Sequence, residues 1–499
     1  MAKENISNGY DLADLETLEI PSTKPRALLS HFGPGLILAM TGMGTSHLVT
    51  APTAGGRFAY ALLWCIPVSY IFKYYGFEMA FRFTNATGKS LLEAYSTAWK
   101  KWPLWYVMIT TLLQCAIGQA GRLIAAAAVT YYVFTINMGL SFPLETYAFL
   151  LGLISVVTIL RGEYKVVEII IKIMAGILLA SSFAVYFVSP VPISEMGHFL
   201  ILEIPDGSWL VIAALLGLLP TGLDRSLQAS EWGKAKQVGL AKARPRLEDA
   251  GLVARFDPFT SSREDLSVDI QNMSPHVRKY CRQWFKIGLW DFRFGHVISA
   301  LVATIFLIMA AVWIYPSEVE GQGFIGEIST IFTESVGAWM MTVFVFGAFA
   351  ATFSGSFVYF DGWSRTVGAC CRNLFKPTAR LSGIGHNHHV TDEYKKKWYS
   401  EYNIYRITMI YSLVASVTLI IGFPRPVFMV LVASTLALFM APVIFFLNLY
   451  YCMVIIPKND KVFYPNRFDR WFGWTSFSIF TGIIIILIYW NIWNPLLGE

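Results

Sequence analysis

The chain has 499 residues, of which 55% are hydrophobic and only 14% are charged, and its net charge is +6. This is too little charge to cover the surface of a soluble globular protein, so the composition excludes that class and predicts an integral membrane protein. The six cysteines show neither disulfide nor zinc spacing and are expected to be reduced thiols. No nucleophile-and-base constellation or phosphate loop is found, so we expect no enzyme, no resident cofactor and no nucleic-acid partner.

Apolar segments long enough to cross about 30 Å of hydrocarbon recur along the chain. They predict an all-α polytopic membrane protein with about eleven transmembrane helices. A polar tail, residues 1–31, precedes them and carries no cleavable signal peptide. The predicted spans are 33–57, 59–83, 104–134, 144–160, 164–189, 208–231, 287–314, 334–358, 403–423, 427–456 and 471–491.

The basic residues predict the orientation, because Lys and Arg concentrate in cytoplasmic loops. Loops 135–143, 190–207 and 315–328 contain no Lys or Arg and are predicted to lie outside, whereas the alternate loops are basic. The amino terminus is therefore expected in the cytoplasm and the carboxyl terminus outside, in a bacterial-type inner or plasma membrane. The lipid bilayer is the expected surrounding, and a monomer is the expected state.

Two polar insertions interrupt the second half of the chain. Residues 233–285 mix both signs of charge and hold few apolar residues, so a cytoplasmic loop with short helices is expected. Residues 372–402 include His386, His388 and His389. These histidines form either a plain polar loop or a weak transition-metal site, and the exposed Gly-rich setting favours the loop.

The first and sixth spans are both interrupted in their middle by residues that hold a helix together poorly. One such span is often a packing kink, but two in matching positions, five helices apart, indicate an inverted-repeat secondary transporter with a polar site near the membrane midplane. Irregular backbone at that depth is tolerated where it lines a cavity. The predicted substrate site comprises Gly44, Thr45, Ser46, His47, Leu219, Pro220, Thr221, Gly222 and Asp224.

Three segments resemble the Nramp family of divalent-metal transporters: "GPGLILAM" from Gly33, "AGGRFAYALLW" from Ala54 and "ATGKSLLEAYS" from Ala86. "GLLPTG" in the sixth span and "AATFSGS" in the eighth are weaker likenesses. The resemblance implies a leucine-transporter-like fold with broken helices 1 and 6, alternating access, and proton-coupled uptake of manganese or iron. It implies two inverted five-helix repeats, 32–190 and 205–457, and an eleventh helix with the carboxyl terminus in 470–499.

The departures from the family fall on the residues that carry its chemistry. The Asp-Pro-Gly-Asn motif of the first break aligns with Gly44, Thr45, Ser46 and His47, so the anionic ligand is missing. The Met-Pro-His of the sixth helix aligns with Leu219, Pro220 and Thr221, and a later histidine aligns with Ser226. In the third helix, Gln119 and Arg122 stand where relatives carry acidic residues. Divalent cations need anionic or strongly dipolar ligands, so these changes put the metal cargo in doubt.

Several residues are candidates for replacement or coupling roles. Asp224 and His47 could form a carboxylate and imidazole pair for a metal or a proton, or Asp224 could cap the second half-helix. Arg122 is a functional candidate, or a structural partner of Glu78 or Asp224. Glu78 and Arg82 are expected to pair, and Lys73 to contact another helix. The coupling or gating candidates are Gln119, Arg122, Arg225, Ser354 and Ser356. For the two serines, close helix packing is the favoured interpretation.

Three functions remain open. The first is secondary transport of a divalent cation of the manganese, iron or magnesium class, with possible proton coupling. The second is transport of a small anionic or zwitterionic solute held by the amides of the first break and by Arg122 or Arg225. The third is a non-transporting sensor, which the small cytoplasmic loops disfavour.

Overall fold

The computed structural model describes most of the chain, and every statement below concerns that part. Of residues 164–175 it describes the backbone alone. The amino half of the first predicted span, the three clustered histidines and the end of the chain lie outside the described residues. These described ranges are 17–24, 44–162, 164–189, 191–235, 237, 239–317, 321–381 and 396–489.

The described residues form helices and contain no β-strand, as the all-α prediction requires. A helical segment stands in each of the eleven predicted spans. In chain order these are η1 (Ser46–Thr50) with α4 (Ala51–Phe58), α5 (Cys65–Thr87), α7 (Trp102–Leu113) with η3 (Gln114–Gly118), α8 (Gln119–Tyr131) and η4 (Tyr132–Asn137), α9 (Leu144–Arg161), α10 (Tyr164–Val188), α11 (Trp209–Leu218) with α12 (Arg225–Ala235), α14 (Pro275–Trp313), α16 (Met340–Leu374), α19 (Glu401–Gly422), α20 (Pro426–Ile455) and α21 (Arg467–Ile488).

Shorter helices fill the connections. The predicted cytoplasmic insertion 233–285 does contain short helices, as expected. The connecting helices are α6 (Leu91–Tyr95), η2 (Trp99–Lys101), η5 (Ile193–Phe199), α13 (Leu240–Asp249), η6 (Glu264–Leu266), η7 (Ile270–Asn272), α15 (Phe324–Thr333) and α17 (Lys376–Leu381).

Seven helices in the described part are long and apolar enough to cross a membrane. α5 is long enough, but Lys73, Glu78 and Arg82 lower its apolar character. α11 is a short apolar helix because the sixth span is broken. The exposed faces of the outer helices are apolar, as lipid contact requires, and they include Leu150 and Ile154 on α9 and Val414 on α19.

Two predicted boundaries were wrong, and in both cases a helix continues past its apolar stretch. α14 begins at Pro275 rather than near 287, because the Ser274 side chain caps its amino end and Pro275 suits the first turn. α16 runs from Met340 to Leu374 instead of 334–358. Its second half is charged, and an Asp361–Arg365 pair four residues apart supports the helix there.

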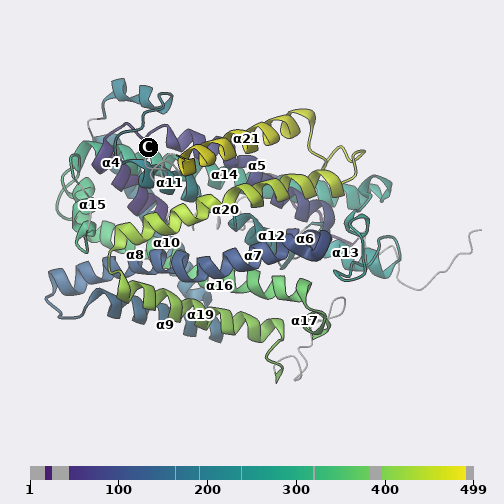
Figure 1. The fold of residues 1–499 in the computed structure, drawn as a ribbon. Coiled ribbons are helices and arrows are strands. Elements are labelled where there is room, and N and C mark those ends of the chain that lie inside the picture. The colour runs from purple at the N-terminus through teal and green to yellow at the C-terminus, as the bar shows by residue number, and fades with distance from the viewer. Residues whose placement is uncertain are drawn as a thin grey trace, which may run out of the picture.

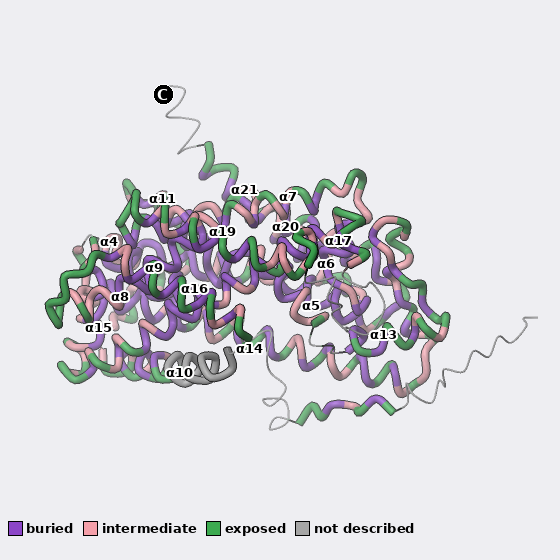
Figure 2. Tube along the Cα trace, turned by 90° about the horizontal axis from the view of Figure 1, so that it is seen from below, coloured by how far each residue is buried: buried purple, intermediate pink, exposed green. Residues whose placement is uncertain are grey.

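The helices pack into one bundle in which segments far apart in sequence are neighbours. α16, α19 and α20 run roughly parallel across the molecule (Figure 1), and α8 packs against α16, α20 and α9. Buried segments fill the interior, and exposed residues lie along the rim (Figure 2). All six cysteines are buried and free, which agrees with the expectation of reduced thiols.

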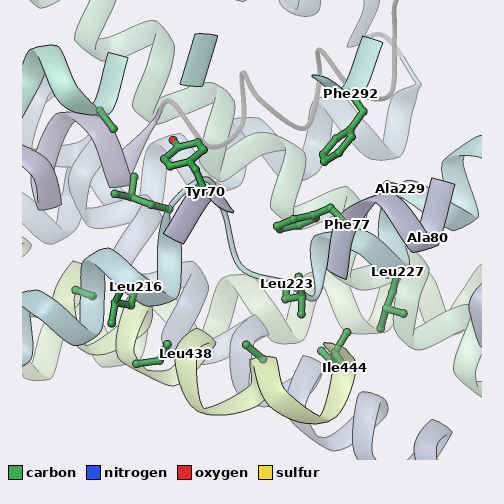
Figure 3. Packing of buried hydrophobic residues seen from close by; sticks show 14 of the residues in the cluster. Tyr70, Phe77, Ala80, Leu216, Leu223, Leu227, Ala229, Phe292, Leu438 and Ile444 are labelled. Atoms are coloured by element: carbon green, nitrogen blue, oxygen red, sulfur yellow. The ribbon is translucent and has the colours of Figure 1, made fainter. Parts of the chain in front are cut away.

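The break in the sixth span lies against α20. Leu216 precedes the break and Leu223 and Leu227 follow it, and these side chains face Leu438 and Ile444 of α20 (Figure 3). The chain between α11 and α12 is not helical, as predicted. Apolar side chains therefore cover the side of the break that faces α20. The backbone carbonyl groups of the break need hydrogen-bond partners from other elements.

Candidate functional site

The carbonyl groups freed by the break in the sixth span are bound by a lysine of α5. Lys73 Nζ lies 2.9 Å from the carbonyl oxygens of Leu216 and Gly217, 2.5 Å from that of Leu219 and 3.0 Å from that of Thr221. Its side chain is fully buried. The expected contact of Lys73 with another helix is thus present, and its partner is one end of the predicted substrate site.

The first-break residues Gly44, Thr45, Ser46 and His47 are all buried. They lead into a π-helix that begins at Ser46, so the described half of the first span is irregular where the break was predicted. His47 Nε2 lies 2.9 Å from the carbonyl oxygen of Ser299 in α14, and therefore donates to it. The hydroxyl of Ser46 lies 2.8 Å from His47 Nδ1. Protein groups engage both ring nitrogens, so neither faces a cargo in this conformation.

Asp224 lies in a different environment from His47. The indole nitrogen of Trp363 donates to Asp224 Oδ2 at 2.8 Å. The pocket beside Asp224 is bounded by α7, η3, α12, α16 and α20. Its lining residues are Val107, Thr110, Thr111, Gln114, Asp224, Leu227, Gln228, Thr366, Met440 and Ile444. The structure thus gives Asp224 a polar pocket but does not bring His47 into it.

The pocket side chains include an unused acceptor and a thioether. Gln114 Nε2 donates to Met440 Sδ at 3.7 Å, while Gln114 Oε1 is buried without a hydrogen-bond partner. Two glycines give these groups room. A Cβ on Gly222 would lie 2.4 Å from Asp224 Oδ1, and one on Gly118 would lie 2.0 Å from Gln114 Oε1. The carboxylate and the amide oxygen therefore occupy space that only glycine leaves open.

A stack of two arginines and two aromatic rings adjoins this pocket. The guanidinium carbons of Arg122 and Arg225 lie 3.6 Å and 3.2 Å from the centroid of the Tyr359 ring. Arg122 also lies 4.9 Å from the ring of Trp363, the residue that binds Asp224. The Tyr359 hydroxyl lies 2.9 Å from that of Thr221. The break, the arginines and Asp224 are linked through α16.

Arg225 is fully buried, yet two of its nitrogens lack partners. Nη1 donates to Gln228 Oε1, whereas Nε and Nη2 have no hydrogen-bond partner. The side-chain nitrogen of Gln228 is also unpartnered. Arg122 donates to the carbonyl oxygen of Gly118 at 2.7 Å. Buried donors without acceptors are costly, so this cluster has unused capacity for an acceptor.

The remaining predicted residues bind either a residue of another helix or a residue of their own helix. Gln119 Nε2 donates to Ser356 Oγ at 2.8 Å, so these two candidates are brought together between α8 and α16. Ser354 donates to the carbonyl oxygen of Ala351 within its own helix. Glu78 and Arg82 pair as expected, with Arg82 Nε donating at 3.0 Å.

Sequence reasoning missed Gln114, Tyr359, Trp363 and Met440. Tyr359 and Trp363 lie one turn apart on α16, beyond the predicted end of that span at 358. The i, i+4 spacing of these two rings after Ser354–Ser356 was the available signal. Gln114 and Met440 sit in strongly apolar spans, and only the packing of α20 on η3 shows that they meet.

Comparisons with known proteins show a partial family match and a shared fold. A family model described as natural resistance-associated macrophage protein-like (Nramp) matches residues 35–230, which include both breaks. A mutant of the Eremococcus coleocola manganese transporter has the same fold, with a TM-score of 0.61 and 15% identity over 97% of this chain and 92% of that one. The family model covers less than half of the chain, and the likeness to the solved transporter at 15% identity shows the fold alone. The long apolar helices of the described part agree with the predicted integral membrane protein.

Two curated relatives align with different lengths of this chain. An uncharacterized protein of Pasteurella multocida is 21% identical over 375 residues, 73% of this chain and 76% of that protein. The divalent metal cation transporter MntH of Brucella suis is 34% identical over 101 residues, which is 20% of this chain and 22% of that transporter. The chain thus aligns with about a fifth of this transporter's length.

No cluster of three or more His, Cys, Asp or Glu side chains suited to a metal occurs among the described residues. A metal site in that part of the chain would therefore combine one carboxylate with neutral donors. The pocket beside Asp224 has this composition.

Proposed function

We propose that this protein is a secondary transporter that moves a divalent metal cation by alternating access, with Asp224 as the anionic ligand of its cargo site. The observation that carries the proposal is the joining of the Asp224 carboxylate, the unused Gln114 Oε1 and the Met440 thioether in one pocket beside the break in the sixth span. His47 is outside this proposal, because both of its ring nitrogens are engaged.

The donor set fits a borderline transition metal better than calcium or magnesium. Carboxylate and amide oxygens suit manganese, and a soft thioether adds discrimination against the hard cations. Thr110, Thr111 and Thr366 add neutral hydroxyl oxygens. The pocket is constricted in this conformation, so cargo would enter when α12 or α16 moves, as alternating access requires.

A proton is the proposed coupling ion. The positions at which Nramp transporters carry acidic residues in the third helix are Gln119 and Arg122 here. Asp224 is the carboxylate of the proposed site. The proposed topology has the amino terminus in the cytoplasm and the carboxyl terminus outside, in the plasma membrane, with the protein acting as a monomer.

Metal binding to the purified protein tests the cargo site. Manganese is expected to raise the Tm more than magnesium or calcium at equal concentration, because a ligand that binds only the folded state stabilises it. Asp224→Asn is expected to weaken manganese binding by at least about tenfold, since even outer-shell partners of metal ligands contribute about 10–100-fold.

Asp361→Asn is the matched control. Asp361 lies on α16, and its carboxylate accepts hydrogen bonds from Arg365 and Tyr405 outside the pocket. The control is expected to bind manganese like the wild type. Equal binding by Asp224→Asn and the wild type would show that the cargo site lies elsewhere.

A second candidate function, transport of a small anion, is favoured by the unpartnered Nε and Nη2 of Arg225. A carboxylate could accept from both, and Arg122 would add a second positive charge. In this case acetate or bicarbonate, rather than manganese, would raise the Tm, and Arg225→Met would abolish the shift.

A further inference from the structure

We propose that the break in the sixth span is a monovalent-cation site that the protein fills with its own lysine, so that Lys73 acts as a tethered cation. This inference goes beyond the proposed cargo site and does not depend on whether the cargo is a metal or an anion. It concerns the carbonyl groups of the break, whereas the cargo proposal concerns the side chains around Asp224.

The geometry around Lys73 is that of a coordinated ion. Four backbone carbonyl oxygens, those of Leu216, Gly217, Leu219 and Thr221, surround Nζ at 2.5 to 3.0 Å. An ammonium group has three N–H donors, so four acceptors exceed what ordinary hydrogen bonding uses. The acceptors come from the last turn of α11 and from the irregular chain after it, so the cage exists only because the helix is broken there.

The charge at this point favours a cation. The carboxyl end of a helix carries negative partial charge, and its last carbonyl groups have no intrahelical partner. In transporters with broken helices, such carbonyl groups coordinate a coupling ion. Here Lys73 Nζ occupies that position, because α5 carries it covalently.

The surroundings close the cage to water. Lys73 is fully buried, and the ring of Phe480 in α21 lies 5.8 Å from Nζ on another side. The hydroxyl of Ser69, one turn before Lys73, lies 3.5 Å from the carbonyl oxygen of Leu215. α5 is thus bound along the last turns of α11, and a free sodium or potassium ion has no place in the break.

The test removes the tethered charge and offers free cations in its place. Lys73→Ala is expected to lower the Tm, and ammonium or potassium is expected to restore at least half of the loss. Choline at the same ionic strength should restore none, because it is too large for the cage. The wild type should have the same Tm in potassium, sodium and choline salts.

Lys89→Ala is the matched control, since Lys89 pairs with Glu248 at 3.1 Å outside the cage. Its Tm should show no preference for ammonium or potassium over choline. Lys73→Gln, which keeps two donors but no charge, is a second variant in case the alanine variant does not fold, and the same recovery is expected.

A Lys73 variant that responds equally to choline and potassium would overturn the inference. So would a wild-type Tm that rises in potassium or sodium relative to choline. Manganese binding at Asp224 is tested separately, by the Asp224→Asn comparison.

Discussion

At the scale of single residues, the site depends on glycines that leave room for polar groups. Gly222→Ala would place a Cβ 2.4 Å from Asp224 Oδ1, so the carboxylate would have to turn away from its present position and from Trp363. We expect manganese affinity to fall about tenfold or more, as when a residue that orients a metal ligand is removed. Helix content should change little. Calorimetric titration measures this, and Gly482→Ala, whose Cβ meets open space, should bind like the wild type. Unchanged affinity in Gly222→Ala would contradict the role given to Asp224.

The sequence predicted several of these residues but not their partners. Asp224, Arg122 and Arg225 were selected because charge is rare in a membrane span, which is a property that a sequence displays directly. The cage around Lys73 was not predictable, because it depends on which turn of α5 meets the end of α11. Helical periodicity fixes the face of a residue but not the neighbour that the face meets.

At the scale of elements, a buried charge cluster joins α6 to the end of α12. Glu93 accepts from the backbone amide of Ser90 and pairs with Lys234 at 2.9 Å. Burial raises the pKa of Glu93, but Lys234, then Lys89 and Arg372, and the Ser90 amide hold it well below its ordinary value of 4.5. The cluster therefore stabilises the fold above pH 4.5, and this stabilisation is lost as the pH falls toward the lowered pKa.

This cluster makes a pH-dependent prediction. Glu93→Gln should have a lower Tm than the wild type at pH 7, and the difference should shrink as the pH falls below about 4.5, because the carboxylate then becomes protonated in the unfolded chain. Thermal unfolding at several pH values measures this. Asp206→Asn, at an exposed turn before α11, should show little difference at any pH. A Tm difference for Glu93→Gln that is constant from pH 7 to pH 3 would exclude this role.

The predicted helix ends are close to the observed ends where a helix stops with its apolar residues. They are wrong where a helix continues into polar residues. α9, α19 and α20 end within a few residues of their predicted limits. α14 and α16 extend well beyond theirs, because caps and i, i+4 ion pairs continue a helix after its apolar residues end. Tyr359 and Trp363, which hold the arginines and Asp224, lie in that unpredicted extension of α16.

At the scale of the whole molecule, the fold is similar to that of a known transporter, whereas the residues at the two breaks differ from the Nramp pattern. The chain shares its fold with a manganese transporter over 97% of its length at 15% identity, while the positions of the family's metal ligands hold Gly44, Leu219 and Thr221. In the proposed site, the pocket beside Asp224 takes the place of those ligands. Lys73 Nζ binds the carbonyl groups of the break, which leaves the break closed to a free cation.

Uptake of manganese into proteoliposomes, with an inward proton gradient, tests this account most directly. We predict accumulation by the wild type and by Asp361→Asn, and background uptake by Asp224→Asn at equal protein incorporation. Manganese uptake that Asp224→Asn leaves unchanged, or accumulation of acetate or bicarbonate with no uptake of any divalent cation, would contradict it.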